Sequence, residues 1–265
     1  RKQVAKAINC EESEIIFTSG ATEGINQGIK GIFNLYHKKG NHIIVSKTEH
    51  KAVIDTIKSL EKEGADITYL DVNSEGIITK KSFESAIKPT TILAAVMWVN
   101  NETGVIQNVK ELSEIAFKNN VPFLCDGTQA VGKVEIDMQD NKIGVLPISA
   151  HKFYGPKGIG ALYIRRKSPR ITLESLITGG NQENRLRAGT LNTPSIVGLG
   201  EAIEIAITNL ESNTKILQEI KAQFKTLFIQ FNAKFNEAES NTPQHVLNVC
   251  IPSIKANNLL KLTRK

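Results

Sequence analysis

The stretch "TILAAVMWVN", residues 91–100, decides the fold class of this chain. Its apolar run from Ile92 to Val99 is unbroken, with no alternation of apolar and polar positions. A strand that is covered by helices on both faces of a parallel sheet has this pattern, because neither of its sides meets water. The run therefore predicts an interior strand of a mostly parallel sheet in an α/β protein.

Short apolar runs alternate with longer helical patterns on either side of this strand. Further strands are expected in "EIIFTSG", "HIIVSK", "DITYLDV", "VPFLCDGT", "VLPISAHK" and "GALYIRR". Helical patterns lie in "TEGINQGIKGIFNLYH", "EHKAVIDTIKSLEKEG" and "NVKELSEIAFKNN". This βαβ rhythm predicts that helices cover both faces of the sheet.

The rhythm changes after about residue 195, where a long helical pattern over 194–231 precedes one strand, "HVLNVCIP". We expect residues 1–200 to form a large domain. Residues 201–265 are expected to hold a connecting helix and the opening of a smaller α+β domain. Both ends of the chain, "RKQVAKAINC" and "ANNLLKLTRK", have helical patterns without caps, so the chain is expected to lack both termini of a longer protein.

Composition limits the function classes. The chain has 265 residues, 40% hydrophobic and 23% charged, as is typical of a soluble globular protein. No apolar run approaches the roughly 18 residues needed to cross a bilayer, and the first residues lack a secretory signal. Three widely spaced cysteines favour a cytoplasmic location over a disulfide frame. The net charge of +6 is scattered, which disfavours nucleic acid as a partner.

Polar residues collect where the predicted strands end, and ligand sites in α/β sheets lie at those carboxyl ends. A helix that begins near Thr22, after Gly20, is either an anion site or simply a capped helix start. His50 is either structural, or able to stack on a planar ring and move a proton. Asn100 and Asn101 either form a turn or point an amide at a ligand.

The segment "SAHKFYGPKGIG", residues 149–160, sets Lys152 between an apolar strand and a turn rich in glycine and proline. Desolvation there would lower the pKa of the amine and prepare it to form a Schiff base. Asp126 could hold a metal, cap a helix or pair with a protonated ring nitrogen. Together these strand ends supply the parts of a pyridoxal 5'-phosphate site.

The segments "GATEGIN", "TEHKAV", "VNNETG", "DGTQAVGK", "SAHKFYGPKGIGALYIRR" and "GGNQENRLRAGTLN" resemble the cysteine desulfurases, enzymes of the class V aminotransferase family. The resemblance implies fold type I of the pyridoxal phosphate enzymes and a homodimer. It also implies conversion of L-cysteine to L-alanine, with the sulfur passing to an enzyme persulfide. The expected partner is an iron–sulfur scaffold or another sulfur-acceptor protein.

The resemblance also implies roles for individual residues. Lys152 would carry the cofactor as a Schiff base and, with His50, move protons. Asp126 would pair with the ring nitrogen, Gln129 with the ring hydroxyl, and Asn101 would lie near that oxygen. The phosphate would be held by Ala21, Thr22, Ser149 and His151, and Thr190 would reach the phosphate of the partner subunit. No metal is expected.

The resemblance leaves the sulfur nucleophile unassigned. In that family the nucleophilic cysteine lies on a loop beyond the part that corresponds to this chain, so we assign the role to none of Cys10, Cys125 and Cys250. Three alternatives stay open: another class V enzyme such as an aminotransferase or selenocysteine lyase, a truncated inactive homologue, and a non-catalytic binding module.

Overall fold

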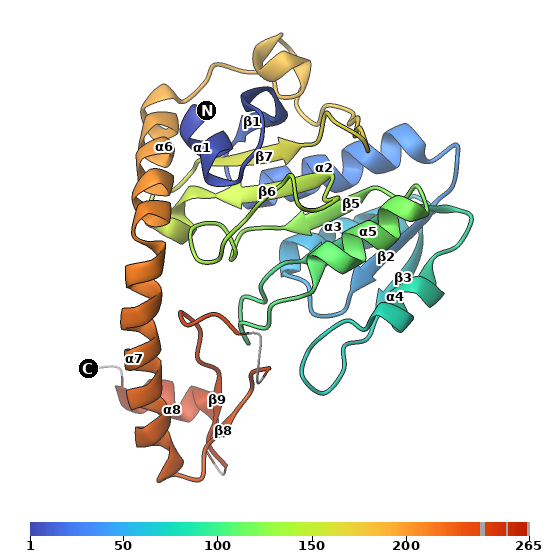
Figure 1. The fold of residues 1–265 in the computed structure, drawn as a ribbon. Helices are drawn as coiled ribbons and strands as arrows, with labels where there is room; N and C mark the ends of the chain where they lie inside the picture. Colours follow the sequence, from blue (N-terminus) through green and yellow to red (C-terminus); the bar gives the residue numbers. More distant parts are fainter. Residues whose placement is uncertain (239–241, 253, 264–265) are drawn as a thin grey trace.

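A computed structural model of the chain describes residues 1–238, 242–252 and 254–263. A seven-stranded sheet forms its centre (Figure 1). All seven predicted strands of the large unit are present, each within the expected segment. Their bounds are β1 Ile15–Thr18, β2 His42–Ser46, β3 Asp66–Leu70, β4 Thr91–Met97, β5 Phe123–Asp126, β6 Val145–Ser149 and β7 Gly160–Ile164.

The strand order is β1-β7-β6-β5-β4-β2-β3. β7 is antiparallel to both of its neighbours, β1 and β6, and the other pairs are parallel. The predicted mostly parallel sheet is therefore confirmed, with β4 in its interior. Because β1 and β6 run the same way on either side of β7, their carboxyl ends lie at the same edge as those of β2, β4 and β5.

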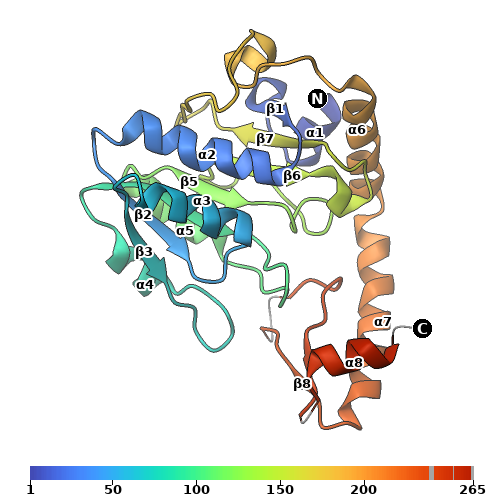
Figure 2. The same ribbon diagram turned by 180° about the vertical axis from the view of Figure 1, so that it is seen from behind.

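Helices cover both faces of this sheet. α2 (Ala21–Tyr36) and α3 (Lys51–Glu61) pack together on one face, in front in Figure 2. α4 (Lys80–Ala86), which the sequence pattern did not predict, packs with α5 (Val109–Lys118) on the other face, in front in Figure 1. α1 (Lys2–Ala7) packs against α6 (Thr193–Thr208). The predicted first helix ends early, so Cys10 lies beyond it.

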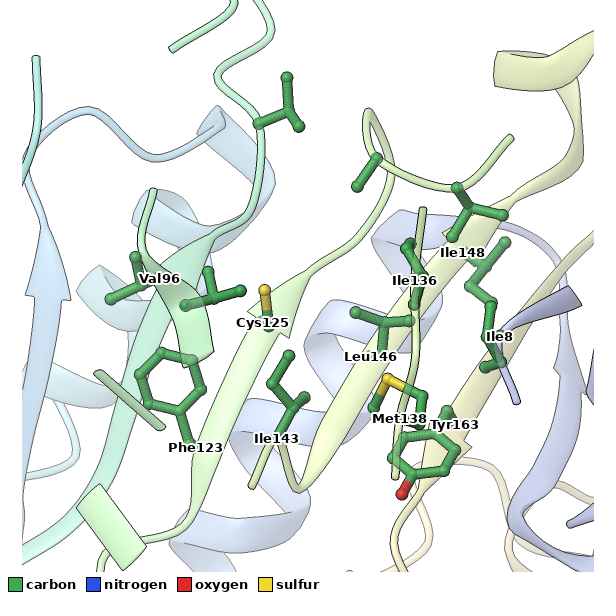
Figure 3. Close-up of a cluster of buried hydrophobic side chains, with 14 of the residues drawn as sticks. Ile8, Val96, Phe123, Cys125, Ile136, Met138, Ile143, Leu146, Ile148 and Tyr163 are labelled. Atoms are coloured by element: carbon green, nitrogen blue, oxygen red, sulfur yellow. The ribbon is translucent and has the colours of Figure 1, made fainter. Parts of the chain in front are cut away.

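Two buried clusters fill the space between sheet and helices. Neighbouring residues of one strand enter opposite clusters: Ile44 faces the side of α5, whereas Ile43 and Val45 face the side of α2. Phe123 and Cys125 belong to the α5 side, where Cys125 lies among aliphatic and aromatic side chains (Figure 3). Burial on both faces explains why these strands read as continuous apolar runs.

The remaining residues extend away from the sheet. The predicted long helix is broken at Asn209, and α7 (Leu210–Ile229) leads to β8 (Lys234–Phe235), β9 (Val249–Cys250) and α8 (Ala256–Thr263) (Figure 1). Only β9 forms within the strand predicted over 245–252. Asn248 Nδ2 donates to the Glu102 carbonyl at 3.2 Å, so this unit contacts the loop after β4.

The predicted domain boundary at residue 200 falls inside α6 and stays a prediction. Three 3-10 helices complete the described elements: η1 Glu12–Glu14, η2 Ala150–Phe153 and η3 Gln182–Arg185. In the described part of the chain, no helix has both the length and the apolar character needed to span a bilayer.

His42 joins three neighbouring strands and should make stability depend on pH. Its ring nitrogens bond the hydroxyls of Thr91 (2.7 Å) and Thr68 (2.8 Å). Burial lowers the pKa of His42, and nearby Lys88 acts in the same direction. The folded state therefore resists a proton that the unfolded chain accepts, so the free energy of unfolding should fall as pH drops below about 6.5.

Urea unfolding at several pH values checks this expectation. His42→Gln should flatten the decrease below about pH 6.5, because the titrating group is gone. His37→Gln, which removes an exposed histidine, should keep the wild-type decrease. Equal slopes in wild type and His42→Gln would contradict the assignment.

Candidate active site

One cavity of about 540 Å³ lies at the carboxyl ends of β1, β2, β4, β5 and β6. Its volume is typical of small-molecule sites, which span about 300–1,000 Å³. The structure brings every predicted site residue except Thr190 to its wall. These residues are Ala21, Thr22, His50, Asn101, Asp126, Gln129, Ser149, His151 and Lys152.

The first turn of α2 forms one end of the cavity. Gly20 precedes it with a φ of 153°, a conformation that favours glycine, and no side chain caps the N-terminus of the helix. Its first N–H groups are therefore available to an anion. Ser149 Oγ lies 2.9 Å from His151 Nδ1 beside this turn. Burial lowers the pKa of His151, and Lys152 and Lys157 lower it further, which favours a neutral imidazole.

Lys152 enters the cavity from η2, directly after β6. Its side chain is half-buried, and among the described residues it makes no hydrogen bond or salt bridge. Its charge still acts on its neighbours, since it contributes to the pKa shifts of Asp126 and His151. A half-buried amine without a fixed partner is free to react with a carbonyl group.

Asp126 ends β5 and is 4% exposed. Its Oδ1 accepts a hydrogen bond from the Thr128 N–H at 2.9 Å. Burial raises the pKa of Asp126, and the Thr128 hydrogen bonds and the Lys152 charge offset part of the rise. A cationic ligand group would favour the ionised carboxylate. The metal alternative lacks companions, since no group of at least three His, Cys, Asp or Glu side chains in the described ranges could hold an ion.

His50 is the N-cap of α3, and this position fixes its tautomer. Its Nδ1 accepts a hydrogen bond from the Ala52 N–H at 3.0 Å, so Nδ1 carries no proton. The proton of a neutral His50 ring therefore lies on Nε2, the nitrogen that is free to exchange a proton with a ligand.

Asn100 and Asn101 follow β4, and the sequence left open whether they form a turn or point an amide at a ligand. The structure shows a different arrangement for each. Asn100 builds the turn: its Oδ1 accepts from the N–H groups of Glu102 and Thr103, both at 2.9 Å, and its Nδ2 donates to the Thr48 carbonyl. Asn101 lines the cavity, and its amide has no hydrogen-bond partner among the described side chains. Of these two asparagines, only Asn101 can therefore offer its amide to a ligand.

Thr190 is the predicted residue that the structure leaves outside the cavity. It lies exposed in the loop before α6, and its predicted contact with a partner subunit stays a prediction. Arg187, in the same loop, donates from Nε to Glu23 Oε1 at 3.0 Å. Burial alone would raise the pKa of Glu23, but hydrogen bonds from Arg187 and the Ser19 N–H hold it below its usual value. This ion pair ties the loop to the first turn of α2.

Glu49 is a buried group that the sequence reasoning missed. It is 8% exposed, and its Oε1 accepts from the Met97 N–H at 2.8 Å. Burial raises the pKa of Glu49 well above its usual value, and the Asp126 charge adds to the rise. Through this hydrogen bond, Glu49 connects the segment that directly precedes His50 to the end of β4. The segment "SKTEHKAV" has no regular spacing of apolar residues around Glu49, so the sequence carried no sign that this side chain is buried.

The thiols differ in exposure. Burial raises the pKa of Cys10 to about 12, with Glu14 adding to the effect, and burial raises the pKa of Cys125 well above its usual value. Both are therefore protonated near neutral pH. Cys250, in contrast, is exposed on β9. None of the three lines the cavity.

Comparison with known proteins extends these observations. A model of the aminotransferase class-V family matches residues 1–265. The cysteine desulfurase IscS of Shewanella loihica is 51% identical over 221 residues, which cover 83% of this chain and 54% of that protein. The chain thus spans about half the length of this relative.

Two solved structures resemble the chain in fold. One, described as a NifS-like protein, has a TM-score of 0.95 and 34% identity, and the match covers 98% of this chain and 71% of that one. Another, described as SspA in complex with cysteine, has a TM-score of 0.85 and 36% identity, with coverage of 99% and 72%. These matches confirm the predicted fold type I architecture and the resemblance on which it rested.

Proposed function

The chain belongs to the aminotransferase class-V family, and we propose that it acts as a pyridoxal 5'-phosphate-dependent cysteine desulfurase. The reaction breaks the carbon–sulfur bond of L-cysteine. Sulfur passes to a protein cysteine thiolate as a persulfide, and the carbon takes a proton to give L-alanine. We further propose a cytoplasmic homodimer whose partner is an iron–sulfur scaffold or another sulfur-acceptor protein.

The observation that carries the proposal is the convergence of Lys152, Asp126 and His50 on one cavity from three different strand ends. An amine without a fixed partner, a buried carboxylate and an imidazole of defined tautomer are the groups that amino-acid chemistry on an aldehyde cofactor requires. The likeness to the Shewanella desulfurase supports the choice of cysteine as substrate.

The cavity residues fit the cofactor. The uncapped first turn of α2 and the Ser149 hydroxyl offer donors for a phosphate. The buried Asp126 carboxylate, which has no cationic partner within salt-bridge distance among the described residues, suits a protonated ring nitrogen. Bound there, the cofactor would supply an electron sink for charge that develops on the amino acid.

The residues of the chain would then have separate tasks. Lys152 Nζ would hold the aldehyde and move a proton at the substrate carbon. His50 would stack on the ring and exchange protons through Nε2, since Nδ1 is occupied by the Ala52 N–H. Asn101 and Gln129 would orient the ring through its oxygen, and Asp126 would keep the ring nitrogen protonated.

Product analysis with the complete natural protein, loaded with pyridoxal phosphate, tests the proposal. Incubation with L-cysteine and a thiol reductant should release alanine and sulfide in equal amounts. Transfer of the amino group to a keto acid without sulfide release would assign the protein to the aminotransferases instead. Turnover of selenocysteine but not of cysteine would assign it to the selenocysteine lyases. A protein that stays colourless with added cofactor would overturn the enzyme proposal.

A further inference from the structure

Lys133 lies four residues after Gln129 and holds its side-chain amide. Lys133 Nζ donates to Gln129 Oε1 at 2.6 Å. Gln129 lines the catalytic cavity, whereas Lys133 does not line it. Lys133 borders a separate groove, whose other walls include Trp98, Val134 and Ile136. Lys133 can therefore contact a ligand in the cavity only through Gln129.

The chemistry of the pair fixes the polarity of the amide. A lysine ammonium has three donors and no acceptor, so the end of Gln129 that faces it must be the carbonyl oxygen. The amide nitrogen is then the polar atom that Gln129 has left for the cavity. A side-chain amide without such a partner could turn over and present either end to a ligand.

The surroundings of Lys133 make Gln129 its partner. No carboxylate lies within salt-bridge distance of Lys133 in the part of the chain that the structure describes, and the Gln129 oxygen is the acceptor of its side-chain hydrogen bond. Burial lowers the pKa of Lys133 to about 8, and the Lys152 charge adds to the effect. Burial also lowers the pKa of nearby His245 to about 4, with Lys133 and Lys221 contributing, so His245 adds no charge near neutral pH.

We propose that Lys133 is a positioning residue that keeps the Gln129 amide nitrogen toward the cavity and so selects a ligand with an acceptor oxygen at that place. The identity of this ligand rests on the proposed function: the acceptor is the deprotonated ring oxygen of pyridoxal phosphate. Lys133 touches neither cofactor nor substrate and acts through Gln129.

The test measures cofactor binding and absorbance, not only turnover. Lys133→Met keeps a side chain of similar length but removes its hydrogen-bond donor. The substitution should weaken pyridoxal phosphate binding about three- to tenfold, as expected for one misdirected hydrogen bond. It should also shift absorbance from the visible band toward the shorter-wavelength form that keeps its proton on the ring oxygen. Lys133→Arg retains a donor and should restore both properties to within about twofold of wild type.

A double-mutant cycle with Gln129→Ala separates positioning from a general structural effect. If Lys133 acts through Gln129, Lys133→Met should change neither affinity nor spectrum in the Gln129→Ala background. Lys110→Met is the matched control, because Lys110 borders the same groove but bonds Asp140 instead. This control should keep the wild-type affinity and spectrum.

The outcomes distinguish this inference from the proposed function. A wild-type spectrum in Lys133→Met, the same change in both backgrounds, or Lys133→Arg behaving like Lys133→Met would overturn the role of Lys133 while leaving the enzyme proposal intact. Failure of the wild-type protein to bind pyridoxal phosphate would overturn the proposed function, and the inference with it.

Discussion

Lys152→Ala should abolish covalent attachment of pyridoxal phosphate and lower cysteine turnover at least about 10²- to 10⁴-fold, the range that a positioned proton-transfer group contributes. The reason is the placement of Lys152 in η2, where its amine faces the cavity beside Asp126 and has no hydrogen-bond or salt-bridge partner in the described ranges. Non-covalent binding should persist at reduced affinity, because the first turn of α2 and Ser149 are unchanged.

Borohydride reduction followed by peptide mapping checks the attachment site. In wild type the label should appear on Lys152. Lys157→Ala provides the matched control, since Lys157 also lies on the cavity wall. This control should keep the label and the visible absorbance. A label on Lys157, or a label that survives in Lys152→Ala, would show that the wrong amine has been assigned.

Asp126→Asn should have opposite effects on catalysis and on the stability of the cofactor-free protein. Removing one partner of a buried charge pair costs about 3–5 kcal/mol, so turnover should fall about 2 × 10²- to 5 × 10³-fold. The substitution keeps the shape of the side chain and the acceptor for the Thr128 N–H. The loss therefore follows from the missing charge rather than from a collapsed cavity.

Stability should move the other way because burial raises the pKa of Asp126. As pH rises above about 3.9, the unfolded chain releases this proton more readily than the folded protein, so the buried carboxyl destabilises the fold near neutral pH. Asp126→Asn removes that cost and should raise the thermal midpoint of the cofactor-free protein. The gain should vanish below about pH 4, where the carboxyl is neutral in both states.

Two measurements check this pair of effects. Thermal unfolding of both cofactor-free proteins at neutral and acidic pH reports the stability difference, and cysteine turnover by the loaded proteins reports the catalytic difference. An unchanged turnover in Asp126→Asn would mean that no cationic group of the cofactor faces this carboxylate. A lower thermal midpoint would mean that the carboxylate is stabilised in the folded protein.

The strands and the residues that line the cavity were predictable because each depends on local pattern. Segments such as residues 91–100 show burial on both faces directly as uninterrupted apolar runs, and polar residues directly after such runs must lie at the sheet edge. Local pattern failed for short elements and for their exact ends. α4 is short, Cys10 follows an early helix end, and only two residues of the strand predicted over 245–252 pair with another strand.

By itself the sequence determined the α/β class, the places where strands end and the residues that stand there, since side-chain polarity and spacing are properties of the chain. Only the tertiary structure decided that β7 runs against its neighbours, that Asn101 rather than Asn100 faces the cavity, and that Lys133 holds Gln129. The direction of β7 depends on its pairing with β1 and β6, whereas the two side-chain arrangements depend on hydrogen bonds between residues two to four positions apart within turns. Such individual hydrogen bonds produce no repeating pattern of polar and apolar residues, so the sequence does not predict them.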